Sequence, residues 1–265
     1  MTFLPRLDAA TPACWPDLVD ELDRWGEAGH VANLWWRDDD AVAATPQLEE
    51  LLRLAGGVPL AVAVIPGSAE PDLAQALRGM SHVAVLQHGW RHTNHAVASD
   101  KSKKSEFPAT RPAGEAAADL VAGASRLWTL FGPQIVPILA PPWNNFAMEF
   151  LPLLAPAGIA GLSTMASELS AMPAGSVVPI DVHVDLVAWK AGRGFIGTGA
   201  ALGLLVGHLR ARRVNATGST RATGILTHHL VMDSATAAFL EQLLAVVSAH
   251  GAARWVAAAE LITWH

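Results

Sequence analysis

The most chemically suggestive part of the sequence runs from Gln87 to His95 and carries three histidines. It directly follows the apolar run Val83–Leu86, which predicts a short buried strand that ends beside His88. Open α/β sheets and (β/α) barrels place their chemistry at such strand ends. Since His88 and His92 are four residues apart, a helical turn there would bring both imidazoles to one face, where they could bind one metal ion.

Three consecutive aspartates, Asp38, Asp39 and Asp40, form a second polar cluster further upstream. They follow the apolar run 31–36, so they too stand at the end of a predicted strand. Carboxylates and imidazoles are common ligands of Zn²⁺ in proteins. Two such clusters at two strand ends are the pattern that we expect of a mononuclear metal site.

Two further clusters follow predicted strands later in the chain. Trp143 and Asn144 come after the apolar run 135–139, and the pair His228 and His229 ends the run that begins at Gly224. Each cluster alone has an ordinary structural explanation, such as a helix cap or a loop. In a (β/α) barrel, however, the strand ends meet on one face, so together the clusters predict one site.

The elements that would position these clusters alternate regularly along the chain. The hydrophobic pattern predicts helices over residues 15–29, 46–56, 71–78, 113–131, 146–156, 199–212 and 235–249. It predicts strands over residues 31–37, 59–66, 83–86, 135–139, 158–164, 179–186, 224–229 and 254–256. Most of these strands are apolar throughout, which is typical of a parallel sheet buried on both faces. Seven or eight β/α units without an internal linker predict one α/β barrel domain over residues 1–265.

One segment, residues 96–112, interrupts this alternation because serine, lysine and proline dominate it. We expect a long solvated loop there, with a substrate lid as the alternative.

Composition excludes several classes of function. The net charge of −6 argues against a nucleic-acid partner or an anionic membrane. The single cysteine excludes an internal disulfide and a thiolate metal site. The first residues lack the pattern of a signal peptide, and no apolar run is long enough to span a bilayer, so we expect a cytoplasmic protein. The oligomeric state is left without a prediction.

Taken together, the motifs resemble those of the polysaccharide deacetylases, carbohydrate esterase family 4 with its NodB-type domain. That family has an Asp-Asp pair after its first strand, a His-x-x-x-His motif, a proline-containing motif near mid-chain and a late Leu-x-His motif. The same order runs over about residues 32–230 of this sequence, in Asp39-Asp40, His88-Gly89-Trp90-Arg91-His92, Pro141-Pro142-Trp143 and Leu226-Thr227-His228.

The resemblance implies a distorted (β/α) barrel that removes acetyl groups from N-acetylated or O-acetylated carbohydrates. It implies that Asp39 is the general base, that His228 is the general acid, and that one divalent metal ion, expected to be Zn²⁺, is bound by Asp40, His88 and His92. An acetylated sugar or oligosaccharide is the expected partner, and the predicted substrate-binding residues are Trp143, Asn144 and His229.

General chemistry is consistent with these roles. One carboxylate and two neutral imidazoles leave open positions on a zinc ion. Such an ion lowers the pKa of water and polarises a carbonyl group. A free carboxylate can then accept the proton of the water, an imidazole can protonate the leaving amine, and a backbone N–H near Trp143 could stabilise the oxyanion.

Two assignments stay open. Asp38-Asp39 is the alternative register for the aspartate pair, although relatives that begin with Arg-x-Asp-Asp match Arg37 and favour Asp39-Asp40. His229 is the alternative to His228 as the acid.

Two other functions also stay open. One is a catalytically inactive carbohydrate-binding protein of the same fold, because Ala140 stands near the place where the family usually has an arginine. The other is a metal-dependent hydrolase of a different C–N bond, since barrels host many chemistries.

Overall fold

The computed structural model describes residues 11–97, 103–165, 177–215 and 221–263. The N-terminal residues 1–8 that carry the prediction about a signal peptide, and residues 98–102 of the predicted loop, lie outside these ranges. The chain divides into two compact units, which are described separately. The first unit comprises Met1–Asp38, Thr45–Leu60 and Val182–Trp264, and the second comprises Asp39–Ala44, Ala61–Asp181 and His265. The expectation of a single domain stays a prediction.

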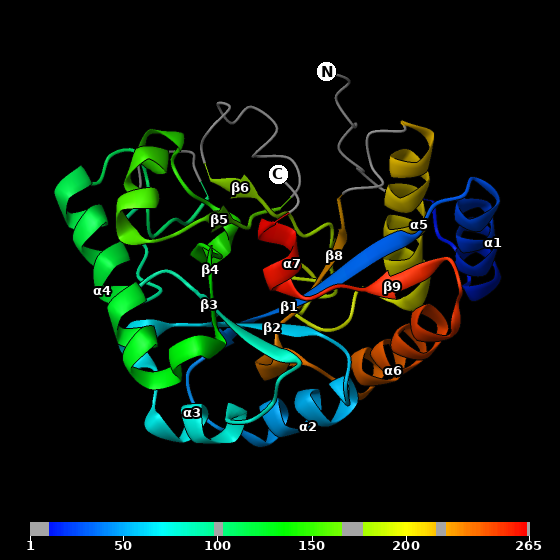
Figure 1. Cartoon of the computed structure of the whole chain (residues 1–265), viewed down its shortest axis with the longest axis horizontal. Coiled ribbons are helices and arrows are strands. Elements are labelled where there is room, and N and C mark those ends of the chain that lie inside the picture. The colour runs from blue at the N-terminus through cyan, green and yellow to red at the C-terminus, as the bar shows by residue number, and fades with distance from the viewer. Residues whose placement is uncertain (1–10, 98–102, 166–176, 216–220, 264–265) are drawn as a thin grey trace. The chain divides into compact units, whose positions relative to one another are not determined.

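The first unit contains five α-helices and four strands in the part of the chain that the structure describes. The helices are α1 (Trp15–Glu27), α2 (Pro46–Ala55), α5 (Thr198–Val214), α6 (Ser234–Ala249) and α7 (Ala258–Ile262). The strands are β1 (Ala32–Ala41), whose last residues belong to the second unit, β7 (Val184–Asp185), β8 (Thr223–Thr227) and β9 (Ala253–Trp255). They pair in parallel in the order β9-β1-β8-β7, and α1 lies beside α5 (Figure 1).

Local sequence explains where these elements begin and end. The Thr45 side chain accepts a hydrogen bond from Leu48 N, and Pro46 supplies the fixed φ of a first helical residue, so α2 begins there. The register between β1 and β8 sets Asp38 opposite Thr227. Asp38 and the residue that precedes the His228-His229 pair therefore lie side by side.

Over the residues that the structure describes, the second unit contains two α-helices and the remaining five strands. The helices are α3 (Pro71–Leu77) and α4 (Ala113–Phe131), and the strands are β2 (Leu60–Val64), β3 (Val83–Gln87), β4 (Ile135–Leu139), β5 (Gly161–Leu162) and β6 (Val178–Pro179). The strand order is β6-β5-β4-β3-β2, and the pairs from β3 to β6 are parallel. Helix α4 packs on β3 and β4 (Figure 1). Every residue of β2 is buried, as its continuous apolar sequence predicts.

Two predicted elements differ from the structure. The strand expected over residues 179–186 is two short strands, β6 and β7, which pair with β5 and β8 respectively. The chain changes partner between Ile180, whose N–H donates to Leu162 O, and His183, whose N–H donates to Gly224 O. The described strands therefore number nine rather than seven or eight. The predicted helix over 146–156 is also wrong: the segment forms 3₁₀ turns, because Pro152 and Pro156 have no N–H to donate.

Within the described residues, no helix combines the length and the hydropathy needed to cross a lipid bilayer.

Candidate metal centre

Asp40, His88 and His92 come together in the second unit. The Nε2 atom of His88 lies 3.1 Å from Asp40 Oδ1, and the Nε2 atom of His92 lies 3.3 Å from the same oxygen. Among the residues that the structure describes, they are the one group of three histidine, cysteine, aspartate or glutamate side chains close enough to share an ion. The structure thus brings together the three residues that the sequence suggests as ligands, and their role as metal ligands stays a prediction.

The spacing of these atoms fits one small divalent cation. Two ligand atoms bound to a tetrahedral zinc ion at its usual bond lengths lie roughly 3.3 Å apart. The Nδ1 atom of His88 lies 2.8 Å from Ala140 O, so it carries a proton and donates it to that carbonyl. The lone pair of His88 Nε2 is then directed toward Asp40, as in zinc sites where the second imidazole nitrogen donates to a backbone carbonyl.

The backbone that holds these side chains is not helical. The chain forms no helical turn from His88 to His92, because Gly89 at φ 63° and His92 at φ 57° are both in the left-handed region. Asp40, at φ 73°, is in the same region at the end of β1. Left-handed conformations are uncommon outside glycine and concentrate at functional sites, where the surrounding structure must enforce them.

The predicted proline motif lies beside this centre. Trp143 and Asn144 follow β4, and both are left-handed, at φ 58° and φ 53°. The Trp143 ring lies 4.3 Å from the ring of His92, centroid to centroid. The structure thus places Trp143 against a candidate metal ligand. The substrate-binding roles of Trp143 and Asn144 stay predictions.

Asp38 is part of a buried network in the first unit. Its Oδ1 lies 2.5 Å from His229 Nδ1, and its Oδ2 accepts a hydrogen bond of 2.7 Å from Thr227 Oγ1. Thr227 in turn accepts a hydrogen bond from Trp36 Nε1 at 2.9 Å. Both oxygens of Asp38 are therefore engaged in hydrogen bonds, whereas Asp40 is the aspartate that meets His88 and His92.

The predicted acid, His228, is also in the first unit. It is 9% exposed, and its ring meets the edge of Trp189 at 4.7 Å between centroids. Trp189 is 44% exposed and donates from Nε1 to Asp185 Oδ2 at 2.7 Å. Sequence reasoning did not single out Trp189, because its contact with His228 depends on the turn after β7.

Sequence reasoning also missed Glu106. The expectation of a solvated loop over 96–112 is wrong for Ser105, Glu106 and Phe107, all of which are buried. The one local signal is Phe107, an aromatic residue in an otherwise polar segment, which favours a segment that folds inward.

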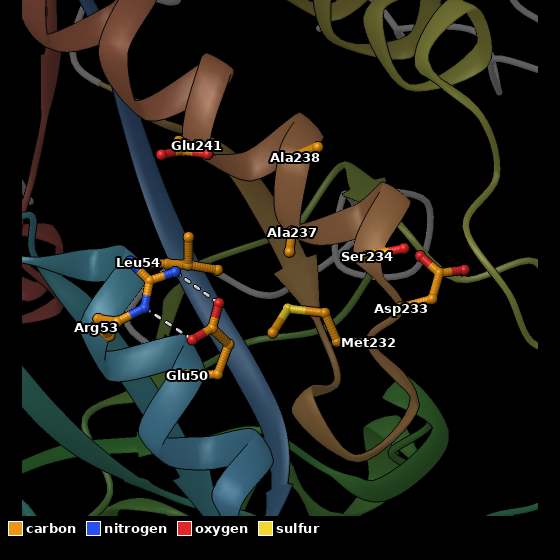
Figure 2. A pocket seen from close by; sticks show the side chains of 9 residues that line it. All are labelled: Glu50, Arg53, Leu54, Met232, Asp233, Ser234, Ala237, Ala238 and Glu241. Carbon is orange, nitrogen blue, oxygen red and sulfur yellow. Dashed lines mark hydrogen bonds and ion pairs between the residues drawn. The ribbon is translucent and has the colours of Figure 1, made fainter.

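A separate hollow lies in the first unit between α2 and α6 (Figure 2). Three of its charged residues, Glu50, Arg53 and Asp233, make local contacts along the chain. Arg53 donates to Glu50 and so lowers the pKa of that carboxyl, and Thr236 N–H donates to Asp233 and lowers its pKa in the same way. This arrangement caps and stabilises the helices and resembles no reaction centre.

No protein family model matches the sequence, and no curated protein matches it either. Solved structures do match. A protein of Mycobacterium smegmatis named as a candidate polysaccharide deacetylase matches with a TM-score of 0.63 at 20% identity, over 95% of this chain and 92% of its own. The Puue allantoinase matches with a TM-score of 0.61 at 12% identity, over 88% of this chain and 89% of its own.

A family 4 acetyl xylan esterase from Clostridium thermocellum, solved in complex with a cobalt ion, matches with a TM-score of 0.53 at 14% identity, over 87% of this chain and 90% of its own. At these identities the likeness concerns the fold. It confirms the predicted polysaccharide deacetylase-like α/β fold of the distorted-barrel class.

Proposed function

We propose that this protein is a metal-dependent hydrolase that removes an acetyl group from an N-acetylated or O-acetylated carbohydrate. One observation carries the proposal: the ligand atoms of Asp40, His88 and His92 converge at 3.1 and 3.3 Å in a fold shared with proteins named as deacetylases and esterases. Neither the geometry nor the fold alone would indicate this chemistry, since the same fold also occurs in an allantoinase.

In this proposal, Asp40, His88 and His92 hold one divalent ion, with Zn²⁺ as the expected metal. When bound, the ion supplies Lewis acidity, which lowers the pKa of water and polarises an acyl carbonyl. The mixed donor set of one carboxylate and two imidazoles leaves coordination positions open, as catalytic zinc sites require. The carbonyl of Ala140 fixes the tautomer of His88 and keeps its Nε2 available.

Two residues of the chain would move protons. Asp39 would accept the proton of the attacking water at its carboxylate, and His228 would donate a proton from an imidazole nitrogen to the leaving group. Asp38 is poorly suited to the role of base, because Thr227 and His229 occupy both of its oxygens. This contact supports the Asp39-Asp40 register over the alternative Asp38-Asp39.

The sugar would be bound by residues that follow the strands. Trp143 is the strongest candidate for this role, because its ring lies against His92 and an indole face can pack on the apolar side of a sugar ring. Asn144 and His229 are the other proposed contacts. His229 is only 1% exposed, so a direct contact with the sugar would require its ring to be uncovered.

The proposal is tested by measuring acetate release from a panel of N-acetylated and O-acetylated sugars, with zinc-loaded protein and with the Asp39→Asn variant as control. We expect the wild type to release acetate from at least one sugar and the variant to be far slower. If the zinc-loaded wild type releases no acetate from any sugar of the panel, the proposed reaction is wrong.

A second candidate is hydrolysis of another C–N bond, and the likeness to an allantoinase favours it. The same protein preparation should therefore be offered allantoin. Consumption of allantoin without acetate release from the sugars would make this second function the better one. Binding of sugars without release of acetate would instead indicate an inactive carbohydrate-binding protein.

A further inference from the structure

Glu106 is a fully buried carboxylate that the proposed chemistry does not use. Its Oε2 accepts a hydrogen bond from Trp90 N at 3.0 Å. Its Oε1 accepts hydrogen bonds from Arg91 N at 2.8 Å and from Thr93 N at 3.3 Å. These three donors are the backbone groups on either side of His92, so one carboxylate organises the loop that carries a metal ligand.

This loop needs such an acceptor. Backbone N–H groups that are buried must be paired, and a loop that leaves the helical region cannot pair them with its own carbonyls. Successive N–H groups in a turn that includes left-handed residues form a concave nest that binds an anion. With Gly89 and His92 both left-handed, the loop presents a nest of this kind, and the Glu106 carboxylate binds there.

Gly89 allows the carboxylate to approach. A Cβ atom at this position would lie 1.9 Å from Glu106 Oε2. The position also has φ 63°, where side chains are disfavoured. The position of the Glu106 carboxylate therefore requires a glycine at position 89 of the His-x-x-x-His motif.

Glu106 is in turn fixed to α4. Arg111 Nη1 donates to Glu106 O at 3.2 Å, and Arg111 Nη2 donates to Asp119 Oδ2 at 2.5 Å. The next residue, Phe107, is fully buried in an apolar cluster that includes Leu120 of α4. Contacts with α4 thus hold Glu106 in place, and its carboxylate links that helix to the backbone around His92.

The same segment also holds the chain beyond Trp143. Ser105 Oγ donates to Asn145 O at 3.1 Å, and Ala147 N donates to Phe107 O at 3.0 Å. The two segments whose rings meet at His92 and Trp143 are therefore anchored to one short stretch, residues 105–107.

We propose that Glu106 is a positioning residue that sets the left-handed backbone of His92 and so directs its imidazole toward the ion. The proposal rests on the metal site of the proposed function. It predicts a specific loss of metal affinity when the carboxylate is changed, over and above any loss of stability. The Glu106→Gln variant keeps the shape of the side chain but places an amide NH₂ against backbone N–H donors.

The matched control is Glu21→Gln in the first unit. Glu21 is equally buried and accepts hydrogen bonds from Arg213, so its loss also removes a buried carboxylate. Zinc affinity is measured by competition with a chromophoric chelator, and the ligand geometry by the visible spectrum of the Co²⁺-loaded protein. We expect Glu106→Gln to bind zinc about 10- to 100-fold more weakly, as for other residues that orient metal ligands, and to show an altered cobalt spectrum. Glu21→Gln should match the wild type in both.

Equal zinc affinity and an unchanged cobalt spectrum in Glu106→Gln would overturn the role of Glu106 and leave the metal site intact. Absence of zinc binding by the wild type itself would overturn the metal site, and with it this inference. If Glu106→Gln does not fold, hydrogen exchange of the wild type decides. Protected amides at Trp90, Arg91 and Thr93 support the proposal, and exchange at the rate of an open loop contradicts it.

Discussion

Among the described residues, two pairs of histidines contact one another, one in each unit, and their surroundings differ. In the second unit the rings of His88 and His92 lie 5.3 Å apart between centroids, tilted by 39°. In the first unit the rings of His183 and His208 stack at 3.6 Å and 27°. Each pair brings two imidazoles together, so the groups that face the ring nitrogens decide whether the pair is suited to hold a metal ion.

In the first unit those groups are donors and a cation. Gly224 N donates to His183 Nδ1 at 2.9 Å, and His208 Nδ1 lies 3.0 Å from Thr223 Oγ1. Burial, and then the charge of Arg212, lowers the pKa of His208 to about 3. Burial, followed by the charges of His208 and Arg212, also lowers the pKa of His183 well below its ordinary value.

In the second unit the facing group is the carboxylate of Asp40, whose negative charge attracts a cation to the ring nitrogens of His88 and His92. In the first unit the positive charge of Arg212 would repel a cation from the other pair. The comparison indicates that the charge opposite a pair of imidazoles decides whether the pair is suited to hold a metal ion. The pair in the first unit is a packing element, and the pair in the second is a candidate centre.

The largest effect should come from breaking the metal-binding pair. His92→Ala removes one of three ligands, so we expect the purified protein to lose nearly all of its zinc while the fold survives. His208→Gln, in the packing pair, should keep a full complement. Elemental analysis of both variants checks this, and full zinc in His92→Ala would show that the ligand assignment is wrong.

Asp39→Asn should separate metal binding from turnover. The variant keeps all three ligands, so its zinc content should be unchanged, but loss of the base should slow the reaction on the order of 10²- to 10⁴-fold. Steady-state acetate release measures the loss. If Asp39→Asn instead loses the metal and Asp38→Asn loses turnover, the register of the aspartate pair shifts by one residue.

The pH profile should identify the acid. A base that must be ionised and an imidazole that must be protonated give a bell-shaped dependence of kcat/KM, with the alkaline limb due to the imidazole. We expect His228→Ala to lose that limb and His229→Ala to keep it, since His229 is tied to Asp38. Loss of the limb in His229→Ala alone would assign the acid to His229.

The smallest effect concerns the packing pair and the stability of the protein. The pKa of His208 falls from an ordinary 6.5 to about 3 on folding. The stability that its neutral form contributes is therefore complete above pH 6.5 and is lost as the pH falls from 6.5 toward 3, at about 1.4 kcal/mol per pH unit. His183 adds to this in the same direction.

Urea unfolding of the wild type and His208→Gln at several values between pH 4.5 and 6.5 tests this effect. The variant should be less stable at pH 6.5 and should show a shallower dependence of the unfolding free energy on pH. Parallel pH dependences in the two proteins would contradict the assignment of a buried neutral imidazole.

Much of the fold follows from local pattern. The helix α4 and the strand β4 have the predicted bounds of 113–131 and 135–139, because long periodic or continuous apolar runs carry a strong signal. The division of the strand predicted over 179–186 could not be predicted from local pattern. Ile180 and His183 bond to different partner strands, and no local sequence feature indicates this change of partner.

The candidate site shows the same limit. The residue types and their positions after strands single out Asp40, His88 and His92 as candidate ligands, but the backbone that joins His88 to His92 could not be predicted. That backbone depends on Glu106, which lies later in the chain and in a segment whose composition indicates solvent. A left-handed histidine held by a distant carboxylate has no local signature.

The central claim is that Asp40, His88 and His92 bind one divalent ion. Crystals of the protein grown with zinc, measured on both sides of the zinc absorption edge, test it most directly. We predict one anomalous peak per chain in contact with Asp40 Oδ1 and the Nε2 atoms of His88 and His92. A peak at other side chains, or full zinc content in solution without a peak at these three atoms, would contradict the account.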